Sequence, residues 1–93
     1  MFITIVHAED YLGIESFVPG QTYKLELEPD NCYDEETIVV KTLKDVKCGH
    51  VANSTNSVAR GTHSAGYVNN LIQEDSKCKV LFVVDDKVIA EIL

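Results

Sequence analysis

The sequence Tyr23-Lys24-Leu25-Glu26-Leu27-Glu28 alternates apolar and charged side chains without interruption. Successive side chains of a β-strand point to opposite faces, so this pattern predicts a strand with one buried face. The turn Val18-Pro19-Gly20-Gln21 precedes it, and Pro29-Asp30-Asn31 ends it. Proline fixes one backbone torsion and glycine accepts a positive φ, so both flanks are typical turn sequences.

Similar short β-rich runs cover most of the remaining chain, at residues 2–6, 37–43, 46–52, 80–84 and 87–93. Residues 65–73 carry a helical stripe of about two turns. Because closure removes exposed sheet edges, we expect a mainly β fold: a small six-stranded OB- or SH3-like barrel with one or two short helices. The period-two positions predict a core of Ile3, Ile5, Leu25, Leu27, Ile38, Val40, Leu81 and Val83, with Val51 and Leu71 at the barrel ends.

Length and composition indicate one globular domain spanning residues 1–93. With 45% hydrophobic residues the chain has enough apolar groups to avoid disorder. Its longest apolar run, Val80 to Val84, is far shorter than the ~20 residues that span a bilayer. Phe2 to Val6 is too short for a signal sequence, so we expect a cytoplasmic protein. Its three cysteines, an odd number, are then expected to be reduced, buried thiols.

Charge is distributed unevenly along this acidic chain, whose formal net charge is −7. An acidic protein is a poor non-specific nucleic-acid binder, because such binding depends on neutralising phosphates. Residues 1–40 hold nine acidic groups against Lys24, whereas residues 41–60 hold four basic groups against Asp45. The middle of the chain therefore forms either a small positive patch or a hairpin with solvated lysines.

Catalytic and metal-binding motifs are weak or absent. The sequence has no nucleophile elbow, phosphate-binding loop or HExxH motif, so we expect a binding module rather than an enzyme. Cys48-Gly49-His50 could place two zinc ligands on one face of a strand. Without a CxxC pair, however, buried thiols and a satisfied histidine are the simpler interpretation, and we expect neither metal nor cofactor.

The connection Asn31-Cys32-Tyr33-Asp34 is the most informative polar segment. Asn and Asp side chains can bond their own backbone and hold such a turn rigid, which would display Tyr33 and Asp34 in fixed directions. The tyrosine could then stack on a flat ring while the carboxylate accepts a hydrogen bond from a sugar hydroxyl. A purely structural turn, with Tyr33 packed over the barrel end, remains the alternative.

Residues 25–49 resemble the HIRAN domain family. The corresponding features are the apolar strand ending at Glu28-Pro29, the turn at residues 31–34, the strand Thr37-Ile38-Val39-Val40 and the pair Gly49-His50. Residues 49–66 look like the version found in small stand-alone bacterial members. The resemblance implies a six-stranded barrel related to the OB-fold that grips the 3′ end of single-stranded DNA.

The same resemblance implies a role for individual residues. Tyr33 would stack on a terminal base, Asp34 would accept the hydrogen bond of the 3′-hydroxyl, and Asn31 would support their turn. His50 would contact a phosphate or base, and Tyr11, in Tyr11-Leu12-Gly13, is similar to the family's aromatic before a glycine. Asn53 completes the expected site.

Two departures from the family pattern weaken the DNA interpretation. Cys32 replaces a proline, and Ala52-Asn53-Ser54 stands where DNA-gripping members have lysines. Two hypotheses therefore remain open. The chain is a weak binder of single-stranded DNA ends, or a stand-alone barrel that binds a protein partner or a small ligand without DNA.

Overall fold

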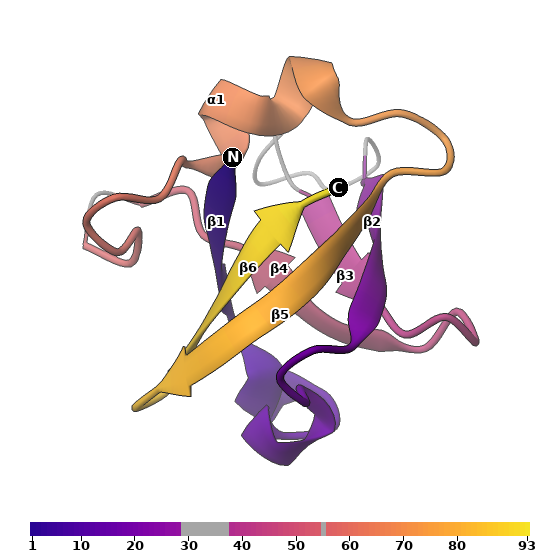
Figure 1. The fold of residues 1–93 in the computed structure, drawn as a ribbon, viewed down its shortest axis with the longest axis vertical. Helices are drawn as coiled ribbons and strands as arrows, with labels where there is room; N and C mark the ends of the chain where they lie inside the picture. Colours follow the sequence, from indigo (N-terminus) through magenta and orange to yellow (C-terminus); the bar gives the residue numbers. More distant parts are fainter. Residues whose placement is uncertain (29–37, 55) are drawn as a thin grey trace.

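The computed structural model describes residues 1–28, 38–54 and 56–93, which form a closed barrel of six antiparallel strands (Figure 1). Around the barrel the order is β1-β4-β3-β2-β5-β6. The strands are β1 (Phe2–Val6), β2 (Thr22–Leu27), β3 (Ile38–Lys41), β4 (Lys47–Val51), β5 (Lys77–Val84) and β6 (Lys87–Ile92). The prediction of a mainly β, six-stranded barrel is confirmed.

Short turns make the barrel possible. At residues 18–21 the amide of Gln21 donates to the carbonyl of Val18 over 3.0 Å, and Gly20 has φ 88°. This is the type II geometry that requires glycine or asparagine at the third position. Between β3 and β4 the positive φ falls on Asp45, and between β5 and β6 it falls on Asp85. Aspartate tolerates this conformation better than most residues, which explains why Asp85-Asp86 closes a hairpin.

The core occupies the inside of the barrel. Ile3, Ile5, Leu25, Ile38 and Val40 are fully buried, as predicted, and Val51 is 4% exposed. Cys48, Cys78, Val80 and Val88 complete the same cluster with no exposed surface. The period-two interpretation therefore identifies buried residues of β1, β2 and β3 correctly.

Three expected core positions are wrong. Leu27 is the last residue of β2 and is 44% exposed although its cross-strand partner Ile38 is buried. Leu81 and Val83 lie at and beyond a β-bulge between Val80 and Phe82, and Val83 is 36% exposed. β5 pairs with β2 only through residues 77–79, so the end of β5 that carries Leu81 and Val83 pairs with β6 alone.

The helical segment is shorter than predicted. It consists of α1 (Ala65–Val68), continued by the 3-10 turn η3 (Asn69–Leu71). Ser64 caps α1 by accepting a hydrogen bond from the amide of Tyr67. Val68 and Ile72 are buried in the core cluster, whereas Leu71 is 51% exposed, so the expected closure by Leu71 is wrong by one residue. No helix in the described part of the chain is long and apolar enough to cross a membrane.

Candidate nucleic-acid interface

A β-bulge in β4 determines which side chains reach the barrel surface. Val40 pairs with Gly49 and Lys41 with Lys47, which leaves Cys48 as an extra residue. Cys48 therefore points into the core together with Gly49, and its thiol donates to the carbonyl of Val40 over 3.3 Å. His50, paired with Val6 and Val39, lies on the outer face.

This bulge separates the two residues of the suspected zinc pair. An unbroken strand would place positions 48 and 50 on one face, but the extra residue puts them on opposite faces. Among residues 1–28, 38–54 and 56–93, no group of three or more His, Cys, Asp or Glu side chains is arranged to hold a metal ion. Cys48 and Cys78 are free, buried thiols, and burial raises their pKa values to about 11 and about 12.

His50 is the centre of an aromatic cluster on the outer face of β4. Its ring centroid lies 5.7 Å from that of Tyr11, at an interplanar angle of 49°, and 5.9 Å from that of His7 in an edge-to-face arrangement. Nε2 of His50 lies 3.3 Å from Oε1 of Glu28. Nδ1 is buried and has no hydrogen-bond partner among the described residues. We call His7, Tyr11, Glu28 and His50 the rim cluster.

Two 3-10 turns carry Tyr11 to this position. η1 (Ala8–Asp10) follows β1, and η2 (Ile14–Ser16) follows Gly13, whose φ of 89° allows the chain to reverse between them. The amide of Gly13 donates to the carbonyl of Ala8 over 2.9 Å, which closes the loop around Tyr11. Tyr11 itself remains 38% exposed.

A buried tyrosine fixes the second half of this loop. The hydroxyl of Tyr23 donates to the carbonyl of Ser16 over 2.6 Å and accepts from the amide of Val18 over 2.9 Å. Its ring packs against Phe17 with a centroid distance of 5.1 Å. Burial raises the pKa of this phenol, so it remains a neutral donor at physiological pH. The loop that presents Tyr11 is thus anchored to the core.

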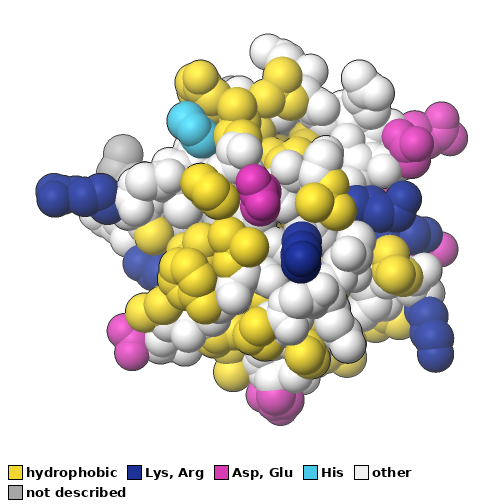
Figure 2. Space-filling model, viewed as in Figure 1, with side chains coloured by type: hydrophobic (Ala, Val, Ile, Leu, Met, Phe, Trp, Pro, Cys, Tyr) yellow, Lys and Arg dark blue, Asp and Glu magenta, His cyan; other side chains and the backbone are white. Residues whose placement is uncertain are grey.

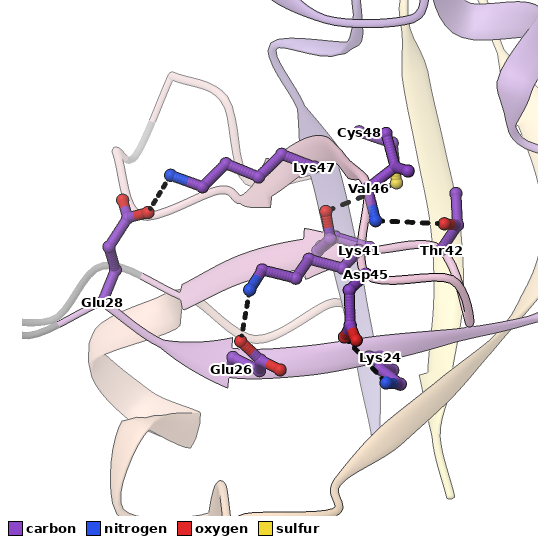
Figure 3. Close-up of polar contacts among 10 residues, drawn as sticks. Lys24, Glu26, Glu28, Lys41, Thr42, Asp45, Val46, Lys47 and Cys48 are labelled. Carbon is purple, nitrogen blue, oxygen red and sulfur yellow. Dashed lines mark hydrogen bonds and ion pairs between the residues drawn. The ribbon is translucent and has the colours of Figure 1, made fainter.

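Cross-strand ion pairs neutralise two of the four basic residues in the middle segment, and a third pair holds Lys24 (Figure 3). Lys47 contacts Glu28 at 2.8 Å, and Lys41 contacts Glu26 at 2.7 Å. Lys24 contacts Asp45 at 2.7 Å, and this lysine holds the pKa of the Asp45 carboxyl below its usual value. Glu28 likewise raises the pKa of Lys47. The three lysines line a solvated face of β2, β3 and β4 rather than an open positive patch.

The structure brings together only part of the predicted site. Tyr11 and His50 are neighbours, although 38 residues separate them in the sequence. Asn31, Tyr33 and Asp34 lie outside the described residues. Oδ1 of Asn53 accepts from the amide of Gly66 over 2.8 Å at the start of α1.

Sequence reasoning missed the carboxylate of the rim cluster. Glu28 directly follows β2 and ends its alternating sequence pattern, which assigns it only to a solvated face. His7 directly follows the first strand and has a left-handed backbone, φ 66°. No local pattern marks either residue, because the cluster forms only when β1, β2 and β4 meet in the closed barrel.

An apolar cavity lies away from the rim cluster, outside the barrel wall. Its volume is about 550 Å³, and its apolar lining includes Phe2, Phe82, Val84 and Ile89. Arg60, Asp85, Asp86 and Lys87 contribute its polar groups. Figure 2 views the molecule from the side of β5 and β6 and shows apolar side chains gathered there. The sequence gives no sign of this cavity, because its walls come from three distant segments.

Comparison with solved structures finds two with the same fold. The HIRAN domain of human HLTF superposes with a TM-score of 0.70 and 17% sequence identity, over 97% of this chain and 69% of that one. A protein from Lactobacillus plantarum gives a TM-score of 0.63 and 19% identity, over 96% of this chain and 85% of its own. No family sequence model matches the chain. No significant sequence match exists among curated proteins. The predicted resemblance is confirmed in three dimensions: the chain folds as a HIRAN-like barrel.

Proposed function

We propose that this protein binds single-stranded nucleic acid and grips the 3′-hydroxyl end of a DNA strand. The observation that carries the proposal is the contact between the half-exposed ring of Tyr11 and His50 on the outer face of β4. Exposed aromatic rings on barrels of this size are stacking platforms for bases, worth about 1–3 kcal/mol per base. The HIRAN resemblance assigns residues at these two positions to a DNA-end site.

The rim cluster offers more than a stacking surface. Glu28 contacts the His50 ring, which limits its rotation, and anchored turns hold the Tyr11 loop. A rigid platform loses less entropy when a ligand binds than a mobile one does. Buried polar atoms are seldom left unpaired. The unpartnered Nδ1 of His50 therefore also supports an arrangement of this ring that changes when a ligand binds.

The expected affinity is modest. Glu9 and Asp10 are exposed directly before Tyr11, and Glu28 lies within the cluster. Each carboxylate opposes an approaching phosphate, and the nearby Lys47 is already paired. Stacking and one or two hydrogen bonds must therefore offset several kcal/mol of association entropy. Dissociation constants in the micromolar range follow from this balance.

Fluorescence anisotropy with short 5′-labelled DNA strands tests the proposal. Tyr11→Ala should weaken binding roughly 5- to 150-fold, the loss expected from one stacked base. Phe82→Ala is the matched control, because Phe82 is 49% exposed but lines the apolar cavity instead. No binding at ~100 μM protein, or equal losses in both variants, would reject the proposal.

The chemical nature of the 3′ end provides a second arm of the same test. If the carboxylate of Asp34 accepts the terminal hydroxyl, a 3′-phosphate places like charges together. At an effective dielectric of about 20, two charges ~4 Å apart repel by roughly 4 kcal/mol. After screening, we expect a tenfold preference for the 3′-hydroxyl. Equal affinity for both ends would remove the end-specific part of the proposal.

The second candidate function is binding of a protein partner or a small ligand without DNA. The apolar cavity of about 550 Å³ favours it, since ligand sites are commonly concave, mostly apolar and edged by a few polar groups. Under this function Phe82→Ala, and not Tyr11→Ala, abolishes binding. An apolar dye such as ANS, titrated against both variants, separates the two functions.

A further inference from the structure

The loop at residues 59–63 is fixed to β1 by a buried hydroxyl. Thr4 has no exposed surface, and its Oγ1 lies 2.7 Å from Oγ1 of Thr62. The amide of Ala59 also donates to Thr4 over 3.0 Å. The amide of His63, the residue after Thr62, donates to the carbonyl of Phe2 over 2.8 Å. These bonds hold the loop rigidly against the barrel.

This rigid loop presents an aromatic pair. The rings of His63 and Tyr67 are stacked, with centroids 4.4 Å apart and an interplanar angle of 17°. Tyr67 is 61% exposed, so one ring face is covered by His63 while much of the side chain meets solvent. Both residues line a hollow of about 430 Å³ that also includes Asn53, Arg60 and Ser64. A flat ring inserted here could extend an existing stack.

Arg60 gives the hollow a positive charge. Lys24, Lys41 and Lys47 are each paired with a carboxylate. Arg60 is exposed and forms no ion pair with any described residue. A guanidinium group can bind phosphate in a bidentate manner. The hollow therefore combines an aromatic stacking surface with a guanidinium group that is available to bind phosphate.

The register of β1 places this hollow at a defined distance from the rim cluster. His50 pairs with Val6, and His63 forms a bridge with Ile3. These two positions are three residue steps apart along β1, which corresponds to about 10 Å. At the ~3.4 Å rise of stacked nucleotides, about three nucleotides cover that distance.

We propose that the hollow at Arg60, His63 and Tyr67 is a second contact site for the same DNA strand. The inference rests on the proposed function. The 3′-terminal nucleotide occupies the rim cluster, and the strand continues along β1 in its 5′ direction. A base about three nucleotides from the end stacks on the His63–Tyr67 pair, and Arg60 binds an adjacent phosphate. Asn53 also lines the hollow.

Strand length distinguishes the second site from the first. A labelled dinucleotide with a 3′-hydroxyl can occupy only the rim cluster, whereas an octanucleotide reaches both sites. We expect the octanucleotide to bind at least tenfold more tightly. Tyr67→Ala and Arg60→Gln should remove most of that advantage and leave dinucleotide binding unchanged. Tyr11→Ala should weaken the binding of both strands.

Salt dependence provides a readout specific to Arg60. Each neutralised phosphate contributes about −0.7 to the slope of log affinity against log salt for single strands. Arg60→Gln should make the octanucleotide slope less negative by about that amount. Lys44→Gln is the matched control, since Lys44 is also exposed and forms no ion pair with a described residue.

The possible failures can be told apart. Equal affinity for both strand lengths, with Tyr11→Ala still harmful, would overturn the second site and leave the proposed function intact. An Arg60→Gln slope equal to that of Lys44→Gln would also overturn it. If neither strand binds the wild-type protein, the proposed function fails and the second site fails with it.

Discussion

Gly49 lies where the barrel wall leaves no room for a side chain. A Cβ atom built at this position would lie 2.9 Å from Cγ2 of Ile5 and 2.9 Å from the carbonyl oxygen of Val6. The backbone oxygen belongs to the β1 ladder, so it cannot move aside without disturbing that ladder. We predict that Gly49→Ala lowers the free energy of unfolding by about 1–3 kcal/mol, the usual cost of overpacking. Urea denaturation measures this, and an unchanged midpoint would contradict it.

Cys48 and Cys78 should be chemically inert in the folded protein. Burial raises their pKa values to about 11 and about 12, and the nearby Cys48 adds to the shift of Cys78. The thiolate is the reactive form, so we predict no iodoacetamide labelling of either residue at pH 8 until urea unfolds the chain. Peptide mass spectrometry reads out the labelling. Rapid labelling of both residues without urea would disprove the burial.

The same two thiols affect stability at alkaline pH. In the unfolded chain each thiol loses its proton near its ordinary pKa of 9.0, whereas the folded state keeps it to higher pH. Their contribution is therefore fully present below about pH 9 and is lost as the pH rises through the folded-state values. We predict a steeper alkaline loss of stability for the wild type than for Cys78→Ala, measured by urea denaturation between pH 8 and 10.5. Parallel curves would show that Cys78 does not titrate as described.

At the scale of elements, β2 provides a matched pair of leucines. Leu25 is fully buried, and Leu27, two residues along the same strand, is 44% exposed. We predict that Leu25→Ala costs about 2–5 kcal/mol of unfolding free energy, whereas Leu27→Ala costs under about 1 kcal/mol. Thermal or urea unfolding of both variants checks the ratio. Similar losses would mean that Leu27 is packed into the core as Leu25 is.

Sequence patterns predicted the elements well because most strands are short apolar, β-branched runs, and β2 also alternates apolar with charged side chains. They failed at Val83 because that end of β5 pairs with β6 alone, and at the Cys48–His50 pair because a β-bulge shifts the alternation by one residue. Such bulges adjust the strands to the closed sheet, and no local residue pattern announces them. Likewise, residue type alone suggested neither the contact of Tyr11 with His50 nor that of His63 with Tyr67. Tyr11 and His50 were paired only through the HIRAN resemblance.

At the scale of the whole molecule, net charge decides how strongly any nucleic acid can bind. The formal charge is −7, and the cross-strand pairs neutralise three of the eight basic residues. Few phosphates can therefore be neutralised. We predict that log affinity for short DNA strands falls with log salt at a slope nearer −1 than −5. Titration at two salt concentrations measures the slope, and a steep value would contradict the prediction.

Reversing the charge beside Tyr11 should strengthen DNA binding. Glu9 and Asp10 are exposed in η1, so the double variant Glu9→Lys/Asp10→Lys replaces local repulsion of phosphates by attraction. We predict an affinity gain of at least tenfold at 20 mM salt, which disappears near 1 M salt, where the screening length falls to about 3 Å. The double variant Glu74→Lys/Asp75→Lys is the control, because these two exposed residues precede β5 and the change in net charge is identical. If both double variants gain equally, net charge alone drives association and the rim cluster is not the binding site; a larger gain for the residues beside Tyr11 places the strand there.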